Sequence, residues 1–153
     1  MNYILINSKN FGLYIDLIES FFEGVSKDDE LFFHPHPLNI IGFQKEISNK
    51  EKNLYFFGEN KGKFIGYGIL RGWDEGYDVP SLGILISKKY KGKGYGLDMM
   101  EYLEIQSRKK RAKRIRLTVL KKNLKAISLY KQLGYTLSDY DEFNLIGFKN
   151  LRN

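Results

Sequence analysis

Apolar positions along the chain follow two spacings, one typical of strands and one typical of helices. Short β-branched and aromatic runs predict strands, whereas apolar residues three and four positions apart predict helices. The expected strands cover residues 2–7, 53–59, 63–71, 81–87 and 115–120, with two more between 135 and 151 around a turn at 139–142. The expected helices cover 11–24, about 38–49, 96–111 and 123–133, and the charged, proline-containing residues 25–39 are expected to form a loop.

This order, β-α-α-β-β-β-α-β-α-β-β, predicts one mixed α/β domain over residues 1–153. Strand 81–87, helix 96–111 and strand 115–120 form a parallel crossover unit, and the hairpin 53–71 indicates antiparallel neighbours. The sheet should therefore be mostly antiparallel. A chain of 153 residues is long enough for one core and short for two.

Composition narrows the class of protein. The chain has no cysteine, which excludes disulfides and thiolate metal sites. It lacks a signal-peptide pattern at its start and any run near the roughly 20 apolar residues of a membrane span, so a cytoplasmic protein without a membrane partner is expected. His34 and His36 are its only histidines, and two ligands without carboxylate support make no metal site.

Positive charge is concentrated in one part of the chain. The net charge is +7, and residues 88–125 are rich in lysine and arginine. Such a region suits any polyanion, either a nucleotide-bearing cofactor or nucleic acid. A nucleic-acid module using residues 108–116 is the weaker interpretation, because these charges fall at a helix end and on a strand.

Three glycines in 88-KKYKGKGYGLDMM-100 join a predicted strand to a predicted helix. Glycines let backbone amides approach an anion, and the first N–H groups of a helix are unsatisfied and favour negative charge. Lys91 and Lys93 can add charge-assisted hydrogen bonds. The loop matches neither the Walker nor the dinucleotide fingerprint. By itself it fits a phosphate site and a solvated basic turn equally well.

A second motif follows one strand later, in 123-NLKAISLYKQLGY-135. On a helix, Asn123, Ala126 and Tyr130 share one stripe. Asn123 is a good N-cap, Ala126 leaves room for a ligand, and Tyr130 places a hydroxyl beside it. The alternative is that all three are ordinary helix residues.

Together, the glycine loop after an apolar strand and N-x-x-A-x-x-x-Y-x-x-x-G-Y after the next strand resemble the GCN5-related N-acetyltransferase (GNAT) family. Lys91 stands where this family usually has Arg or Gln. The resemblance covers nearly the whole chain. It implies a GNAT fold with a mostly antiparallel sheet of six to seven strands, about four helices, and a V-shaped splay between strands 81–87 and 115–120, where acetyl-CoA binds.

The resemblance also implies roles for particular residues. Tyr130 would be the general acid for the departing thiolate. With reference pKa values of ~10 for a phenol and ~8.5 for a thiol, full proton transfer from Tyr130 is uphill by roughly 2 kcal/mol. A hydrogen bond from Tyr130 to the developing thiolate is therefore the better description. The implied cofactor-binding residues are Ile84, Leu85 and Ile86 for the pantetheine arm, Lys91, Gly92, Lys93, Gly94, Tyr95, Gly96 and Leu97 around the pyrophosphate, and Asn123, Ala126 and Tyr130.

The sequence leaves the identity of the general base open. Strand 81–87 has no ionisable residue, and Thr118 stands where some relatives carry glutamate. The candidates for a base or a water relay are Glu75, Asp78, His34 and His36.

Two segments, 31–39 and 70–84, are candidates for the acceptor pocket. An aromatic ring beside carboxylates can stack on a sugar and hold hydroxyls or an ammonium. The expected acceptor-binding residues are His34, His36, Trp73, Asp74, Glu75 and Tyr77. We expect acetyl transfer by direct attack in a ternary complex, from acetyl-CoA to a primary amine of a small molecule such as an amino sugar or a nucleotide-linked amino sugar. The alternatives are a protein N-terminus, a polyamine, or a non-catalytic acyl-CoA sensor, and the chain is expected to be a monomer or homodimer.

Overall fold

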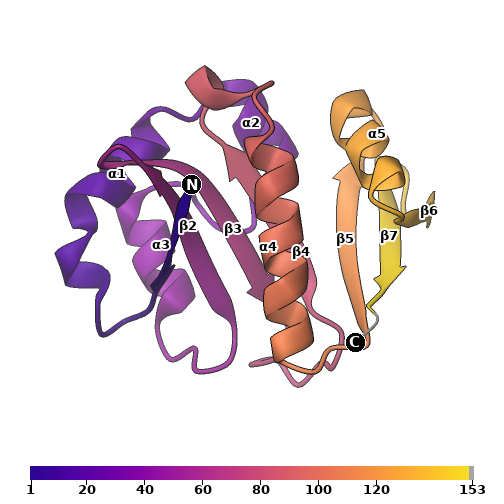
Figure 1. Ribbon diagram of the computed structural model, residues 1–153, viewed down its shortest axis with the longest axis horizontal. Helices are drawn as coiled ribbons and strands as arrows, with labels where there is room; N and C mark the ends of the chain where they lie inside the picture. The colour runs from indigo at the N-terminus through magenta and orange to yellow at the C-terminus, as the bar shows by residue number, and fades with distance from the viewer. Residues whose placement is uncertain (152–153) are drawn as a thin grey trace.

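A seven-stranded sheet forms the middle of three layers in the computed structural model, which describes residues 1–151 (Figure 1). Its strand order is β1-β2-β3-β4-β5-β7-β6, and all neighbours are antiparallel except β4 and β5. The strands are β1 (Asn2–Ile6), β2 (Leu54–Asn60), β3 (Lys63–Arg71), β4 (Ser81–Ile86), β5 (Arg114–Leu120), β6 (Thr136–Asp139) and β7 (Asn144–Asn150).

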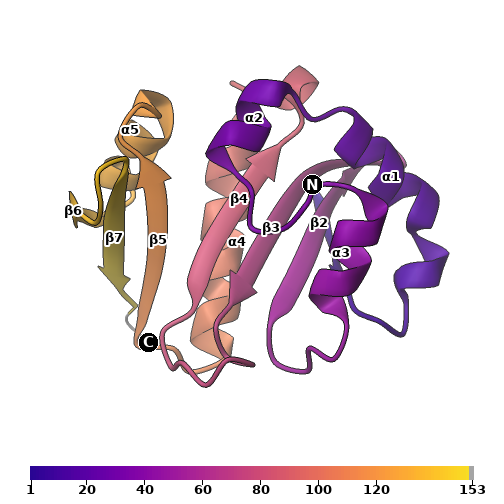
Figure 2. The same cartoon turned by 180° about the vertical axis from the view of Figure 1, so that it is seen from behind.

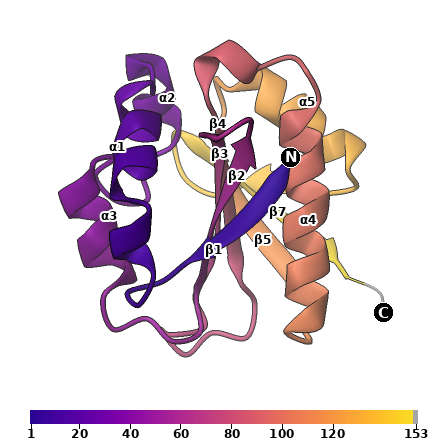
Figure 3. The same cartoon turned by 60° about the vertical axis from the view of Figure 1, so that its left-hand side comes forward.

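Helices cover both faces of this sheet (Figure 3). One face carries α1 (Ile15–Glu23), α2 (Lys27–Phe32) and α3 (Ile40–Ile47), and the other carries α4 (Tyr95–Lys109) and α5 (Leu124–Gln132). Short 3-10 turns occur at Phe11–Leu13 and Lys88–Tyr90. In the described part of the chain, no helix combines the length and the apolar character that a membrane crossing needs.

The predicted mixed α/β, mostly antiparallel fold is confirmed, but the loop predicted for residues 25–39 is wrong because it contains α2. Ser26 caps this helix: its hydroxyl accepts a hydrogen bond from the Asp29 N–H at 3.1 Å. Acidic residues in the first turn also suit the helix dipole. The helix predicted over 11–24 is divided at Tyr14, so Leu13 lies on a 3-10 turn and is exposed.

Two hydrophobic clusters, one on each face of the sheet, hold the layers together, so the single core expected for a chain of this length is divided by the sheet. Between the sheet and α1 and α3 lies an aromatic core in which the Phe57 and Tyr67 rings stack at 4.8 Å. On the opposite face, Met99, Met100 and Leu103 of α4 are fully buried against the sheet. Since apolar burial is the main stabilising contribution to folding, both faces fix the position of the sheet between them.

The two parallel strands part soon after they meet, as Figures 1 and 2 show. The register of β4 and β5 consists of Ser81 opposite Arg116, and the Arg116 N–H donates to the Pro80 carbonyl at 3.0 Å. Beyond that point the strands diverge towards their carboxyl ends. The V-shaped splay expected between them is confirmed, and it leaves backbone groups of β4 without a strand partner on the β5 side.

Candidate active site

A cavity of about 580 Å³ lies in this splay, and we call it the splay cavity. It is bounded by β4, the glycine loop, α5, and α2 on its far side. Of the predicted cofactor-binding residues, it is lined by Ile84, Leu85, Ile86, Lys91, Gly92, Gly96, Asn123, Ala126 and Tyr130. Lys93, Gly94, Tyr95 and Leu97 belong to the same loop and helix start but do not line it.

The glycine loop has the backbone of an anion site. Gly92 and Gly94 have φ values of +74° and +89°, and a Cβ at either would meet no atom within 4 Å. The glycines are therefore required by backbone conformation and not by space. Gly94 is the N-cap of α4, so the first N–H groups of this 15-residue helix have no intrahelical acceptor.

Two lysines lie on this loop. The Lys91 ammonium forms an ion pair with Asp29 of α2, and Lys93 lies over the Tyr90 ring at 5.6 Å. Unsatisfied helix N–H groups together with nearby cations make the loop suited to a phosphate or pyrophosphate group.

Tyr130 projects from α5 into the splay cavity. Its side chain is 8% exposed, and no hydrogen bond joins its hydroxyl to another group in residues 1–151. Burial raises the pKa of Tyr130 to about 12. The hydroxyl is therefore protonated at neutral pH and available as a hydrogen-bond donor. Asn123 caps the same helix, with its side-chain oxygen accepting from the Ala126 N–H at 3.3 Å.

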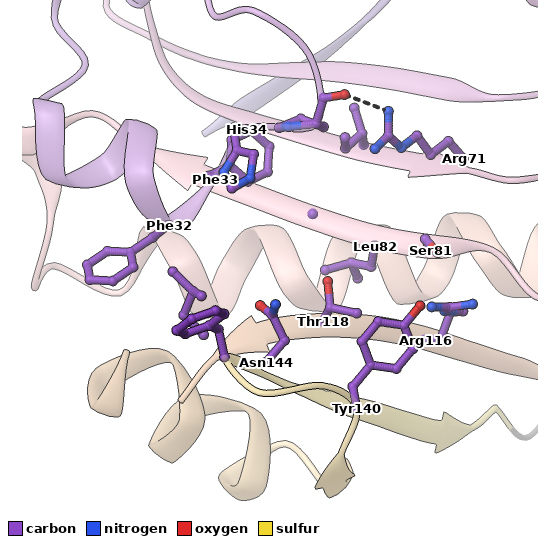
Figure 4. Close-up of a pocket in the computed structure, with 15 residues that line it drawn as sticks. Phe32, Phe33, His34, Arg71, Ser81, Leu82, Arg116, Thr118, Tyr140 and Asn144 are labelled. Atoms are coloured by element: carbon purple, nitrogen blue, oxygen red, sulfur yellow. Dashed lines mark hydrogen bonds between the residues drawn. The ribbon is translucent and has the colours of Figure 1, made fainter. Parts of the chain in front are cut away.

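Figure 4 shows a second cavity of about 590 Å³, the arginine cavity, which adjoins the first. Residues common to both linings are Phe32, Phe33, Leu82, Gly83 and Thr118. Polar side chains of the arginine cavity are His34, Arg71, Ser81, Arg116, Thr118, Tyr140 and Asn144, and no aspartate or glutamate is among its lining residues. A molecule in one cavity can thus approach a molecule in the other.

Glu75, Tyr77 and Asp78 line a third cavity of about 690 Å³, which shares Arg71, Ser81 and Arg116 with the arginine cavity. The structure therefore brings His34 into one cavity and these three residues into its neighbour. Trp73, Asp74 and His36 line none of the three cavities. In the described part of the chain, no three His, Asp or Glu side chains gather as a metal site would require.

Asp74 and Glu75 are occupied by contacts within the fold. The Asp74 carboxylate accepts from the N–H groups of Glu51, Lys52 and Asn53 at 3.0, 3.1 and 2.7 Å. Burial alone would raise the pKa of Asp74, but these three donors lower it. Glu75 accepts from the Asn53 side chain at 3.1 Å and lies 3.5 Å from the Lys50 ammonium. Both carboxylates tie the turn after β3 to the segment before β2.

His36 is buried, although it lies on the same loop as the exposed His34. Because the Pro37 carbonyl can only accept, Nδ1–H of His36 donates to it at 2.8 Å, and Nε2 accepts from the Tyr67 hydroxyl at 2.7 Å. Burial lowers the pKa of His36, against the opposing effect of its backbone hydrogen bond. The lone pair that a base would use is therefore engaged by Tyr67. A catalytic role for His36 stays a prediction.

Protonation of His36 should weaken the fold. Its pKa is lower in the folded than in the unfolded chain, where it is about 6.5, so the unfolded chain binds more protons at acid pH. The stability contributed by neutral His36 is complete above pH 6.5 and decreases as pH falls below it. We expect the melting temperature of wild type to fall more between pH 7.5 and 5 than that of His36→Asn, measured by scanning calorimetry. An identical pH dependence in both proteins would contradict this.

Comparison with known proteins defines the class. The model of the acetyltransferase (GNAT) family matches residues 14–135, and the chain belongs to this family, which uses acetyl-CoA as its donor. A curated relative, the probable spermine N(1)-acetyltransferase of Bacillus subtilis subsp. natto, is 31% identical over 99 residues. The matched stretch covers 62% of this chain and 64% of that protein, so it spans less than two thirds of the relative.

Solved structures share the fold. The GNAT domain of S. lividans PAT superposes with a TM-score of 0.80 at 17% identity, over 97% of this chain and 89% of that one. The PaiA N-acetyltransferase of Thermoplasma acidophilum, in complex with coenzyme A, gives 0.70 at 18% identity, over 98% and 99%. At these identities the likeness establishes the fold alone.

Some lining residues were missed from the sequence. Asp29, Phe32 and Phe33 come from α2 and its end, and the signal for them was Ser26 followed three residues later by Asp29. Arg116 was counted only as part of a basic stretch. The alternation of β5 places Ile115 and Leu117 in the core, and it could have placed Arg116 on the opposite face beside Thr118.

Proposed function

We propose that this chain is an acyl-CoA-dependent N-acetyltransferase that moves an acetyl group from acetyl-CoA to the primary amine of a small molecule, by direct attack in a ternary complex. The observation that carries this proposal is the meeting of the two cavities at Thr118 and Leu82. The splay cavity is lined by the glycine loop and Tyr130, and the arginine cavity is an open polar space for the acceptor.

The donor would lie along β4. Backbone groups of Ile84, Leu85 and Ile86 that face β5 have no strand partner beyond Ser81, so they can bind the amides of a pantetheine arm. The N–H groups at the start of α4, from Tyr95, Gly96 and Leu97, would bind the pyrophosphate with Gly92 and Gly94 shaping the loop.

Chemistry at the thioester needs two proton movements. The amine nitrogen attacks the carbonyl carbon, the new C–N bond forms, and the C–S bond breaks as the thiolate leaves. With a pKa of about 12 for Tyr130 and ~8.5 for a thiol, complete proton transfer would be uphill by roughly 5 kcal/mol. Tyr130 therefore acts by donating a hydrogen bond to the developing thiolate, and the burial that raises its pKa also strengthens that bond.

The amine must also lose a proton. Among the residues lining the arginine cavity, His34 is the side chain with a ring nitrogen that can accept a proton, since the guanidinium groups of Arg71 and Arg116 have no lone pair to offer. We assign it as the general base. Glu75 and Asp78, in the neighbouring cavity, are the candidates for a water relay. His34 and Tyr77 would contact the acceptor, for which an amino sugar or a nucleotide-linked amino sugar is proposed.

Two measurements test this function. Acetyl-CoA should raise the melting temperature, by mass action on a ligand that binds the folded state. Release of free coenzyme A thiol is then followed over a panel of amino sugars, nucleotide-linked amino sugars, spermidine and peptides. No stabilisation at millimolar acetyl-CoA would contradict the donor site. Stabilisation without thiol release from any amine would instead favour an acyl-CoA sensor.

A further inference from the structure

Arg116 lies where the arginine cavity and the third cavity join. Its backbone is fixed between β4 and β7, opposite Ser81 on one side and Phe148 on the other. Its side chain lines both cavities, and Figure 4 shows it beside Tyr140 at the edge of the arginine cavity. The guanidinium is thus held on a rigid strand at the rim of the proposed acceptor space.

This guanidinium lacks a protein partner for one of its donors. The Nε atom of Arg116 is buried and makes no hydrogen bond within residues 1–151. No acidic side chain of the described chain forms an ion pair with it, in contrast to Arg71, which lies 3.3 Å from Glu46. A buried donor left unpaired loses its hydrogen bonds to water without replacement, and the loss is greater for a charged group, so such groups are rare without a ligand or function.

The charges around Arg116 leave a positive excess. Arg71 is held by Glu46 and by the Pro35 carbonyl at 3.1 Å, so its charge is compensated. In the third cavity Glu75 pairs with Lys50, and Asp78 is exposed. Arg114, the neighbouring cation on β5, lies over the Phe148 ring at 4.6 Å. The remaining lining residues of the arginine cavity near Arg116 are neutral.

We propose that Arg116 binds an anionic group on the acceptor, a phosphate or a carboxylate. This deepens the proposed function and rests on it: the acceptor is an amine that also carries an acid, and not a polycation. The planar guanidinium fork matches both anions. Polyamine recognition would need carboxylates; the arginine cavity has none among its lining residues, and in the third cavity Glu46 and Glu75 are already paired with Arg71 and Lys50.

The strand sets the spacing between amine and acid. Arg116 is two residues before Thr118, where the two cavities meet, and both lie on the same face of β5. Residues two apart on one strand face are roughly 7 Å apart. The anion should therefore be several bonds away from the reacting nitrogen, as in an amino-sugar phosphate, and not adjacent to it as in an α-amino acid.

Matched acceptors test this directly. We expect kcat/KM with glucosamine 6-phosphate to exceed that with glucosamine by tenfold or more in wild type. A second pair, 4-aminobutyrate and butylamine, tests a carboxylate in the same way. Arg116→Gln should abolish the advantage of the acidic partner while leaving the neutral amine within about twofold. Arg114→Gln, on the same strand, is the control and should keep the advantage. A larger gain for the phosphate pair or the carboxylate pair identifies the anion.

A binding measurement keeps the inference testable apart from turnover. Calorimetric titration of the protein saturated with coenzyme A, which has no acetyl group to transfer, with glucosamine 6-phosphate and with 4-aminobutyrate should show, for at least one of them, binding that Arg116→Gln weakens tenfold or more. Suppose that wild type acetylates neutral amines or spermidine with the same kcat/KM as acidic amines, and that Arg116→Gln leaves these values unchanged. The anion site is then wrong, and the acetyltransferase proposal stands. Absence of acetyl-CoA stabilisation would instead count against the proposed function. If no amine is acetylated, the titration decides, and equal binding to wild type and variant overturns the inference.

Discussion

Replacing Tyr130 with phenylalanine is expected to lower kcat for acetyl transfer at least tenfold and to leave the Kd for acetyl-CoA within about twofold. The ring stays in place, packed 5.9 Å from the Tyr135 ring, so the shape of the splay cavity is kept. The hydroxyl has no hydrogen bond to lose within residues 1–151, so the fold should not weaken. The one interaction removed is the hydrogen bond to a negative sulfur, which forms only as the C–S bond breaks.

Pre-steady-state thiol release measures the rate of acetyl transfer, and equilibrium titration with acetyl-CoA measures its Kd. Tyr102→Phe is a suitable control, since it removes a phenol from α4 on a residue that stacks on Tyr3 at 3.8 Å and lines none of the three cavities. Unchanged turnover in Tyr130→Phe would remove its catalytic assignment. A matching loss of cofactor affinity would indicate that Tyr130 supports binding instead of the transition state.

The fold was predictable because its strongest signals are local. Each strand is a continuous or alternating apolar run, and each long helix has its own periodicity, so seven strands and their places along the chain followed from the pattern. The glycine loop and Asn123–Tyr130 lie at the ends of such elements and were placed with them. Helix α2 was missed because it is six residues long and its capping signal was outweighed by the prolines that follow.

The acceptor side was less predictable because its contacts connect distant segments. Nothing near Asp74 in the sequence shows that its carboxylate binds backbone N–H groups 21 to 23 residues away. Similarly, His34 and His36 each directly precede a proline, and they look equivalent in the sequence. Only the position of Tyr67 on β3 determines that one imidazole is buried and hydrogen-bonded and the other lines a cavity.

That difference makes the two histidines a matched pair. We expect His34→Asn to lower kcat/KM about 100-fold, the usual size of a general-base contribution, with little change in melting temperature because His34 is exposed. His36→Asn should keep kcat/KM within about threefold. It should instead destabilise the fold by about 1–3 kcal/mol, since the buried Tyr67 hydroxyl would lose its acceptor.

Steady-state thiol release and thermal unfolding of both variants show which histidine is needed for activity and which for stability. Added imidazole should restore part of the rate to His34→Asn, because the small base can enter the space left in the arginine cavity; a residue that only shapes the cavity would show no such rescue. The reverse pattern, with activity lost in His36→Asn and retained in His34→Asn, would make His36 the base despite its hydrogen bond to Tyr67. Retained activity in both would transfer the role to the water relay at Glu75 and Asp78, whose carboxylates line the neighbouring cavity.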